Sequence, residues 1–438
     1  MENFIGLLIN PVFVSVILLC ILCIRRINVL LAIIISTITA GLLSGLNIKD
    51  VMQVFIAGMG GNSETALSYI LLGAFAATMA HSGFTDVISS KISSFVGNNK
   101  WILLGILAII AMASQNIVPI HIAFIPIIIP PLLTTMNKLK IDRRAVASVL
   151  AYGLKMPYIA LPVGFGLIFQ NLIADNMVQN GVAIARNDIW KYTLILAIGM
   201  TVALFVALFI TYRKPRMYED KPLKFTSTVG GKFLPKHWIV IGAAMSTFIV
   251  QLLTQSLPLG ALVGLGIIFS FKVIPQDKMD HMMNEGIYLM GYVAFVMLVA
   301  AGFASVLKET GAIENFVNIV LNYLPNNILL TSLIILLLGL FITIGIGTSF
   351  GTIPILAVLF IPVCLKLGFN IPQMVVLIAA AAALGDAGSP ASDTTLGPTS
   401  GLNADGEHNH IYDTCIPTFL HFNTALILFA LIGIWIFS

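Results

Sequence analysis

Two carboxylates stand close together in residues 384–396, whose sequence is LGDAGSPASDTTL. Asp386 and Asp393 are set among glycines, a proline and hydroxyl side chains, while the sequence on both sides is apolar enough for lipid. Glycine and proline disfavour a continuous helix here, and serine and threonine offer partners to the freed backbone groups. An ionisable residue inside a membrane is costly and therefore indicates a functional site. A helix end followed by a polar loop is the structural alternative.

Oxygen atoms dominate this stretch and two others that break apolar runs. Such surroundings, with one or two carboxylates, suit a hard and weakly bound cation such as Na⁺. We therefore predict a Na⁺ site with Asp386 and Asp393 as metal ligands. His121 could carry a proton near neutral pH, or could simply be a hydrogen-bonded residue. The other candidate substrate- or cation-binding residues are Ser389, Ser392 and Thr394 in the first stretch, Thr348, Ser349 and Thr352 in the second, and Ser114, Gln115 and Asn116 in the third.

Lys155 is the one basic residue that falls in the middle of an apolar segment, residues 145–172. An unpaired lysine at membrane depth is costly, so it needs a partner or must reach the surface. We predict that it is a tethered positive charge that replaces a bound cation in the first half of the chain. Neutralising a substrate carboxylate, with help from the N-terminal dipole of the following half-helix, is a second possible role. A lysine that extends to the cytoplasmic face is the simpler alternative.

The composition is that of a membrane protein with many spans. Of the 438 residues, 58% are hydrophobic and only 10% are charged, whereas soluble domains carry about 25% charged residues. The net charge of +4 is small and spread over loops, so a nucleic-acid partner is not expected. We predict an all-α polytopic membrane protein in contact with the lipid bilayer.

Apolar runs long enough to cross a membrane recur in the same order in both halves of the chain. Two segments instead have polar middles, 101–136 and 328–365, which predicts re-entrant hairpins with their tips near the membrane midplane. Two others, 145–172 and 371–400, are interrupted, which predicts broken helices. The expected spans are 4–24, 28–46, 65–83 and 190–212 in the first half, and 237–254, 257–274, 286–307 and 413–437 in the second.

Adding 228 to a residue number superposes the two halves without a gap from residue 75 to residue 162. The Asn98-Asn99 pair then meets Asn326-Asn327, and Pro162 meets Pro390. We therefore predict a first repeat at 1–212, a cytoplasmic linker at 213–236 and a second repeat at 237–438. Each repeat would contribute five spans and one hairpin.

Positive charge predicts the orientation of the chain. The segments expected on one side, including Arg25 and Arg26, hold 17 of the 23 basic residues, which makes this side cytoplasmic. Because five spans is an odd number, the two repeats would insert in opposite directions. Inverted repeats with broken helices and polar groups at the midplane are typical of secondary transporters.

Other classes of protein explain the residues less well. Intramembrane aspartyl proteases use a GxGD motif and a YD pair, but here the first glycine is absent and the order of the two motifs is reversed, with Tyr412-Asp413 at a span edge. A channel would need a continuous pore. The histidines of His408-Asn-His410 fit no standard metal spacing, and a cytoplasmic polar loop explains them more simply. We therefore expect a transporter and not an enzyme.

The run Gly385-Asp386, Ser389-Pro390 and Ser392-Asp393-Thr394-Thr395 resembles the signature of the NhaC-type antiporter family, in the ion-transporter superfamily. Residues 396–408 and 413–418 resemble its YuiF-like branch of amino-acid transporters. The resemblance implies an elevator fold, in which hairpins and broken helices move against a scaffold. It also implies cation coupling and amino-acid substrates, histidine among them. Ala387 stands where the antiporters often have a polar residue.

The prediction from sequence is therefore a secondary active transporter of an amino acid in the cell inner (cytoplasmic) membrane. Its coupling ion would be Na⁺, with H⁺ as the other candidate, and no cofactor is expected. The alternative is a Na⁺/H⁺ antiporter without an organic substrate. The sequence leaves open the amino acid, symport or antiport, and the oligomeric state, for which a homodimer is one candidate.

Overall fold

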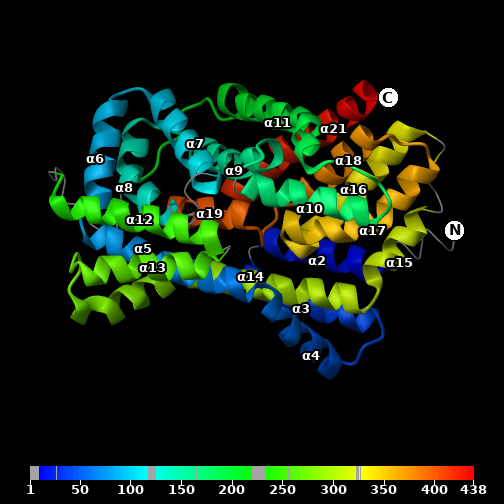
Figure 1. Cartoon of the computed structure of the whole chain (residues 1–438), viewed down its shortest axis with the longest axis horizontal. Coiled ribbons are helices and arrows are strands. Elements are labelled where there is room, and N and C mark those ends of the chain that lie inside the picture. Colours follow the sequence, from blue (N-terminus) through cyan, green and yellow to red (C-terminus); the bar gives the residue numbers. More distant parts are fainter. Residues whose placement is uncertain are drawn as a thin grey trace.

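The computed structural model describes residues 9–25, 27–116, 125–163, 165–219, 233–254, 256–321, 325 and 327–438. These residues fold into helices, and no strand occurs among them (Figure 1). The helices of the first half are α2 (Pro11–Ile24), α3 (Val29–Leu43), α4 (Ile48–Met59), α5 (Ser63–His81), α6 (Phe84–Val96), α7 (Lys100–Asn116), α8 (Ile125–Lys138), α9 (Arg143–Ala160), α10 (Phe165–Gln179) and α11 (Ile189–Val206). Those of the second half are α12 (Pro235–Thr254), α13 (Leu257–Ser270), α14 (Met279–Glu309), α15 (Ala312–Leu321), α16 (Ile328–Ile346), α17 (Ser349–Lys366), α18 (Ile371–Ala383), α19 (Asp393–Leu402), α20 (Ile416–Thr418) and α21 (Thr424–Ile436).

Asparagine and aspartate residues decide where many of these helices begin. Asn28 caps α3 and Asp142 caps α9, each through a side-chain oxygen that accepts from a backbone N–H of the first turn. Asn370 and Gln373 form a reciprocal capping box at the start of α18. Each cap satisfies an N–H that has no partner within the helix, so polar residues between apolar runs mark the helix boundaries.

The helix boundaries repeat at the offset of 228 residues. Adding 228 to the first residues of α3, α6, α9 and α10 gives the first residues of α13, α15, α18 and α19. The same offset takes the last residue of α5 to the last residue of α14, and that of α8 to that of α17. The correspondence in sequence therefore extends to the order and the boundaries of the helices.

Close helix crossings repeat at the same offset. A Cβ added to Gly153 would lie 2.4 Å from the Cβ of Ala111, where α9 crosses α7. At the equivalent crossing of α18 with α16, a Cβ on Gly339 would lie 2.6 Å from the Cβ of Ala381. Each crossing needs one glycine. In the first half the glycine belongs to α9, whereas in the second half it belongs to α16, which is the counterpart of α7. The two halves therefore share the close packing distance but not the position of the glycine.

A second pair of crossings joins the two halves to each other. Gly286 of α14 lies against Ala74 of α5, where an added Cβ would come within 2.3 Å of the Ala74 backbone nitrogen. Gly58 of α4 lies against Gly302 of α14, and the offset relates this contact to the first one. The two helices α5 and α14 therefore run antiparallel over a long interface.

Buried apolar side chains form two clusters. The smaller one joins α5, α12, α13 and the start of α14, which run side by side in the lower part of Figure 1. The larger one contains most of the remaining helices, and α18 is buried along nearly its whole length. A helix that is apolar and buried on all sides lies inside a helical bundle, and α18 leads directly into the predicted ion site.

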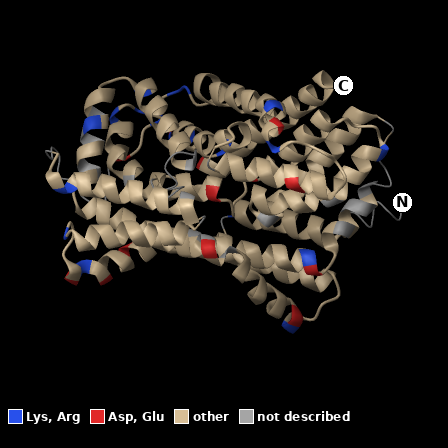
Figure 2. Cartoon of the chain, viewed as in Figure 1, with Lys and Arg blue, Asp and Glu red and all other residues tan. Residues whose placement is uncertain are grey.

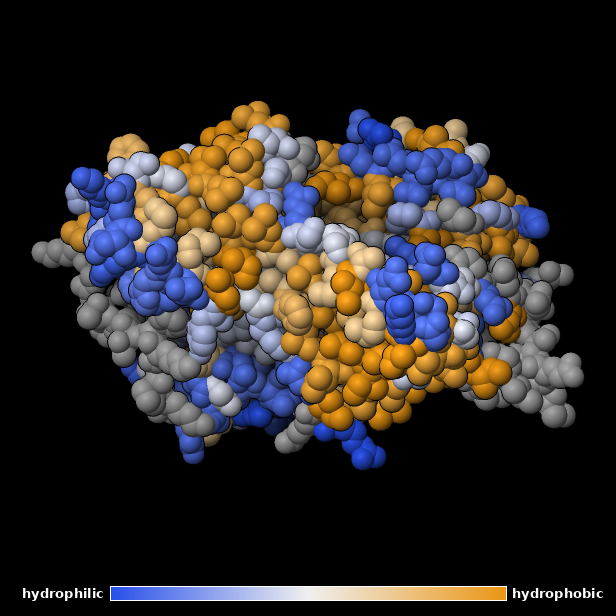
Figure 3. Space-filling view, turned by 90° about the horizontal axis from the view of Figure 1, so that it is seen from below, coloured by the Kyte–Doolittle hydropathy of each residue, from blue (hydrophilic) through white to orange (hydrophobic). Residues whose placement is uncertain are grey.

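Charged residues are sparse along the helices (Figure 2), and broad apolar areas reach the surface (Figure 3). Exposed apolar side chains include Ile210, which is 68% exposed, and Trp435, which is 67% exposed. By length and composition, three helical stretches could cross a membrane, namely Arg186–Thr211, Ile328–Gly345 and His410–Ile436, or up to six if each bent pair counts as one span. The surface fits a lipid environment, and the ten spans expected from the sequence stay a prediction.

The predicted breaks and one predicted turn lie where the structure interrupts its helices. Helices α9 and α10 meet at an angle of 47°. Helices α16 and α17 are joined by a sharp turn at Gly347, whose φ of 78° favours glycine. The chain between α18 and α19 is not helical over residues 384–392 apart from turns. Unexpected from the sequence were α4, α6 and α15, which are short helices between the predicted spans.

Candidate functional site

Two glycines hold the break between α18 and α19. Gly385 has a φ of 82° and Gly388 a φ of 101°, and both lie in the left-handed region that favours glycine. There is also no space for a side chain, because a Cβ on Gly385 would lie 2.7 Å from the carbonyl oxygen of Leu340. The chain then enters α19 through Ser392, whose hydroxyl accepts from the N–H of Thr394 at 3.2 Å. The break places Asp386 between two helix ends.

Asp386 is 3% exposed and accepts hydrogen bonds on both carboxylate oxygens. Its Oδ2 accepts from the hydroxyls of Tyr158 and Ser349, each at 3.0 Å. Its Oδ1 accepts from the hydroxyl of Ser392 and, at 3.3 Å, from that of Thr394. The donors come from α9, from the tip between α16 and α17, and from the start of α19. One carboxylate thus connects three elements that are far apart in the sequence.

Lys155 supplies the positive charge opposite this carboxylate. It is fully buried, and its Nζ lies 3.3 Å from Oδ2 of Asp386 and also donates to the carbonyl oxygen of Ala383. Ala383 is the last residue of α18, so its carbonyl belongs to the partly negative end of that helix. The alternative in which Lys155 extends to the surface is wrong.

Equivalent residues of the two halves contact each other at this point. Lys155 binds Ala383 and Tyr158 binds Asp386, and each of these pairs is separated by 228 residues. A residue can touch its own counterpart only where the two halves meet around a shared axis. The charged pair therefore lies where the two halves meet.

Asp393 is the first residue of α19, directly after the break, and is only partly buried. Its Oδ2 accepts from the hydroxyl of Tyr69 at 3.3 Å, and Tyr69 belongs to α5. Its Oδ1 lies 3.4 Å from the hydroxyl of Ser392, which also donates to Asp386. One hydroxyl proton is thus shared between two carboxylates, although it can be donated fully to only one of them at a time.

The remaining predicted residues lie at varied distances from this centre. Ser114 is buried but donates to the carbonyl of Ala111 in its own helix. Thr352 donates to the carbonyl of Thr348, so both help to shape the tip. The hydroxyl of Ser389 donates to the carbonyl of Ile344 on α16 at 3.4 Å and accepts from the N–H of Ala391 at 3.2 Å. The side chains of Gln115 and Asn116 and the whole of His121 lie outside the described residues.

Sequence reasoning did not assign Tyr158 and Tyr69 to the site. In the sequence, the one signal for Tyr158 is that the offset of 228 relates it to Asp386. Its hydroxyl donates directly to that carboxylate. Tyr69 had no distinguishing signal, because tyrosines are common in spanning helices. A search for polar groups opposite each carboxylate in the other repeat would have found Tyr158.

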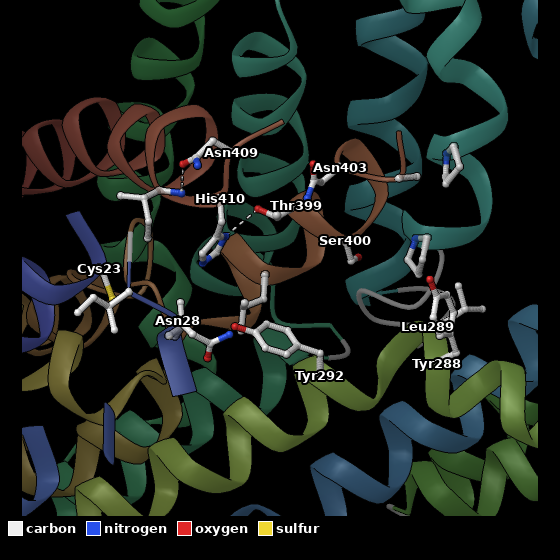
Figure 4. A pocket seen from close by; sticks show the side chains of 17 residues that line it. Cys23, Asn28, Tyr288, Leu289, Tyr292, Thr399, Ser400, Asn403, Asn409 and His410 are labelled. Carbon is white, nitrogen blue, oxygen red and sulfur yellow. Dashed lines mark hydrogen bonds between the residues drawn. The ribbon is translucent and has the colours of Figure 1, made fainter. Parts of the chain in front are cut away.

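A cavity of about 630 Å³ lies beside α19 (Figure 4). It begins at Leu396, three residues beyond Asp393, and extends between α14 and the start of α3. No charged side chain is among its described lining residues, if His410 is counted as neutral. The polar side chains that line it are Asn28, Tyr288, Tyr292, Thr399, Ser400, Asn403, Asn409 and His410. The cavity could hold an uncharged or zwitterionic solute of moderate size.

The two histidines near this cavity are bound within the protein. His410 lies 3.0 Å from the carbonyl of Pro390 and 2.8 Å from the hydroxyl of Thr399 (Figure 4). His408 lies in the loop after α19, with its Nε2 2.7 Å from the hydroxyl of Thr414. Burial lowers the pKa of His408 to about 3, so this ring is neutral at physiological pH. The contacts of both rings fit structural roles.

An ion pair ties the start of α9 to the loop that follows α19. Arg143, at the start of α9, binds both carboxylate oxygens of Asp405, at 2.7 and 2.5 Å. It also donates to the carbonyl of Leu402 at 2.9 Å. Burial acts to raise the pKa of Asp405, but the hydrogen bonds and charge of Arg143 outweigh it and hold this pKa below its ordinary value. The pair fixes the loop that follows α19.

The fold, the buried ion pair and the apolar surface define a multi-pass membrane protein of the secondary transporter class. The sequence model described as "Na+/H+ antiporter family" matches residues 149–434, and one described as "Na+-H+ antiporter family" matches residues 10–96. The first match covers well over half of the chain. The protein therefore belongs to the Na⁺/H⁺ antiporter family, of the NhaC type, and to its YuiF-like branch.

Relatives with similar sequences cover nearly the whole chain. A Bacillus subtilis (strain 168) protein named "Putative amino acid transporter YuiF" is 43% identical, with 97% of this chain and 99% of the relative aligned. An "Uncharacterized membrane protein VP2115" of Vibrio parahaemolyticus is 41% identical over 97% and 99% of the two chains. The crystal structure of the Alcanivorax borkumensis YdaH transporter aligns with 89% of this chain and 88% of its own, at 12% identity and a TM-score of 0.46. A TM-score below 0.5 does not establish a shared fold.

Proposed function

We propose that this protein is a secondary active transporter that carries an amino acid, with histidine among the candidates, across the cell inner membrane. Transport is coupled to Na⁺, or to H⁺ in its place. The observation that carries the proposal is the buried carboxylate of Asp386, which faces the ammonium of Lys155 and several hydroxyl groups. The name of the Bacillus relative supports an amino acid as the transported solute.

The oxygen atoms around Asp386 and Asp393 suit a sodium ion. Two carboxylates and the hydroxyls of Ser392 and Thr394 converge there, with the backbone carbonyl of Asp386 3.0 Å from the Thr394 hydroxyl. These are hard neutral and anionic ligands of the kind that Na⁺ prefers. A cation between the carboxylates would also relieve the sharing of one hydroxyl proton between them.

The cation can bind Asp386 only if it displaces the ammonium of Lys155. That ammonium already neutralises Asp386, so an incoming cation must compete with it for the same carboxylate. When the ammonium moves away, it also leaves the carbonyl of Ala383 at the end of α18. Cation binding is thereby linked to the contact between the two halves of the chain, which is what ion-coupled movement requires.

The repeated crossings support inverted repeats that move in the manner of an elevator. Contacts between counterparts at residues 155 and 383, and at 158 and 386, fit a pseudo-twofold axis through the ion pair. In inverted-repeat transporters such an axis lies in the membrane plane and passes near the substrate site. The hairpins and broken helices around Asp386 would form the moving part, and α5 with α12 to α14 would belong to the scaffold.

A Na⁺/H⁺ antiporter without an organic substrate is the second candidate, and the name of the family fits it equally well. The cavity beside α19 favours the organic solute. Its volume of about 630 Å³ far exceeds the need of an ion, and it falls within the roughly 300–1,000 Å³ of small-molecule sites. Its lining combines apolar side chains with several uncharged polar ones, which suits a solute without net charge better than a bare cation or anion.

Uptake into proteoliposomes tests the proposal. The purified protein would be offered a panel of labelled amino acids with and without an inward Na⁺ gradient. We expect uptake that depends on Na⁺ and is lost in Asp386→Asn. The matched control is Asp188→Asn, because Asp188 forms an exposed pair with Lys191 far from the site. Exchange of Na⁺ for H⁺ without uptake of any amino acid would contradict the proposal and support the second candidate.

A further inference from the structure

Two histidines and one glutamate converge at one end of the molecule, away from the ion pair. His81 is the last residue of α5, and His281 and Glu285 lie near the start of α14. Because α5 and α14 run antiparallel, the end of one lies beside the start of the other (Figure 1). The spacing of four residues puts His281 and Glu285 on one face of their helix. Their ligand atoms and that of His81 all lie within 4.8 Å of one another.

We propose that these three side chains form a binding site for a divalent transition-metal ion of the Zn²⁺ type. Two imidazoles and one carboxylate are a ligand set that zinc accepts with a water molecule in the fourth position. The site is independent of the transport function proposed above, because it uses none of the residues around Asp386.

The distances fit a shared ion. The Nε2 of His81 lies 2.9 Å from Oε2 of Glu285, and the Nε2 of His281 lies 3.2 Å from Oε1. Two ligand atoms at bond lengths of about 2.0–2.1 Å from a tetrahedral zinc are separated by about 3.3 Å. Each contact is near the spacing that a metal imposes, and because the two contacts reach different oxygens of Glu285, a shared ion requires a bidentate carboxylate or a rotation of the side chains.

The site is accessible to solvent, so an ion and a water molecule as its fourth ligand can enter. The side chain of His281 is 59% exposed, that of His81 is 36% exposed and that of Glu285 is 19% exposed. The two imidazole rings are nearly perpendicular, at 73° with centroids 5.7 Å apart, so they are not stacked on each other.

The equivalent contact of the repeat, between α4 and the end of α14, lacks these ligands. At the offset of 228, His81 corresponds to Glu309, His281 to Gln53 and Glu285 to Ala57. The fold repeats, but the imidazoles occur at one end only, which is the end that positive charge predicts to be cytoplasmic. The cluster is therefore not a by-product of the repeat. A metal here would fasten the end of α5, and α5 also carries the Tyr69 that binds Asp393.

Calorimetric titration with Zn²⁺ tests the site. The full-length protein would be purified in detergent, freed of its affinity tag and treated with a chelator. We expect one Zn²⁺ per chain, with a Kd that rises by at least about tenfold in His81→Ala, in His281→Ala and in Glu285→Gln, or about 1.4 kcal/mol in each. His421→Ala is the control, because His421 lies on another element and contacts Thr211.

Thermal unfolding gives a second readout that does not depend on transport. Zn²⁺ should raise the Tm of the wild-type protein and of the His421 variant, but not that of Glu285→Gln, whose shape is unchanged. The proposal is overturned if the wild-type protein binds no Zn²⁺, or if all three variants bind it as tightly as the wild type. Because no step measures transport, these outcomes are separate from those that test the proposed function.

Discussion

Residues 154–165 and residues 382–393 are equivalent in the repeat, yet they break in different places. Helix α9 continues through Pro157 to Ala160, whereas α18 ends at Ala383, which corresponds to Lys155. The second segment therefore exposes its helix end five residues earlier. The freed carbonyl of Ala383 then meets the Nζ of Lys155, which comes from the helix that did not end.

The two repeats share one architecture but carry complementary chemical groups at this place. The second copy carries the carboxylates, and the first copy carries the cation and the tyrosine hydroxyl that bind Asp386. Gly385 and Gly388 allow the early break, while their counterparts, Pro157 and Ala160, remain helical. Two identical sites would repel each other's charge where the halves meet, whereas one acidic and one basic copy attract each other.

The largest effect is expected from removing one member of the ion pair. Lys155→Met should abolish transport and lower the free energy of unfolding by about 3–5 kcal/mol, because it leaves the buried carboxylate of Asp386 without its cation. The double variant Lys155→Met, Asp386→Asn should regain much of the lost stability but no transport. Thermal unfolding and proteoliposome uptake measure the two effects.

This experiment tests whether Lys155 and Asp386 act as an interacting pair or as two independent sites. If the destabilisation by Lys155→Met and that by Asp386→Asn simply add in the double variant, the two side chains do not form a functional pair. The control is Lys191→Met, which removes a lysine from an exposed pair with Asp188 and should change neither quantity.

A smaller effect is expected from the tyrosine of the first copy. Tyr158→Phe removes one hydrogen bond to Asp386 and leaves Lys155 in place. A hydrogen bond to a charged group contributes about 1.5–3 kcal/mol. The half-saturation concentration for the coupling cation should therefore change by about tenfold or more, with the direction set by whether the hydroxyl supports the carboxylate or competes with the ion.

The control for this variant is Tyr152→Phe in the same helix. The hydroxyl of Tyr152 lies 2.9 Å from that of Thr201 and is not among the described contacts of Asp386. It should leave the cation dependence unchanged. Equal behaviour of the two variants would show that the first copy contributes only the charge of Lys155.

The smallest effect concerns the pH dependence of the ion pair between Arg143 and Asp405. Because Arg143 holds the pKa of Asp405 below its ordinary value of about 3.9, the pair stabilises the folded protein fully above that value. The stabilisation is lost as the pH falls further, through the lowered pKa. The difference in Tm between the wild type and Asp405→Asn should thus be equal at pH 7 and pH 5, and should shrink below about pH 4. A difference that already shrinks between pH 7 and pH 5 would contradict this assignment.

Much of the architecture follows from the sequence alone. The composition predicts an all-helical membrane protein, and the offset of 228 recurs in the helix boundaries of the two halves. The break after α18 was also predictable, because glycine, proline and hydroxyl residues weaken a helix wherever they cluster. These are local properties, and they are readable without knowing what packs against each segment.

Only the tertiary structure decided how the candidate residues are paired. Sequence reasoning treated Lys155 as the surrogate for a first-half cation, and it did not assign Tyr158 to the site. The fold brings both to Asp386, which lies more than 200 residues away. Pairing across such a distance depends on where two helices cross, and crossing is set by close contacts such as Gly153 against Ala111. The type of a buried polar or charged residue shows that it needs a partner. The packing of the helices determines which residue that partner is.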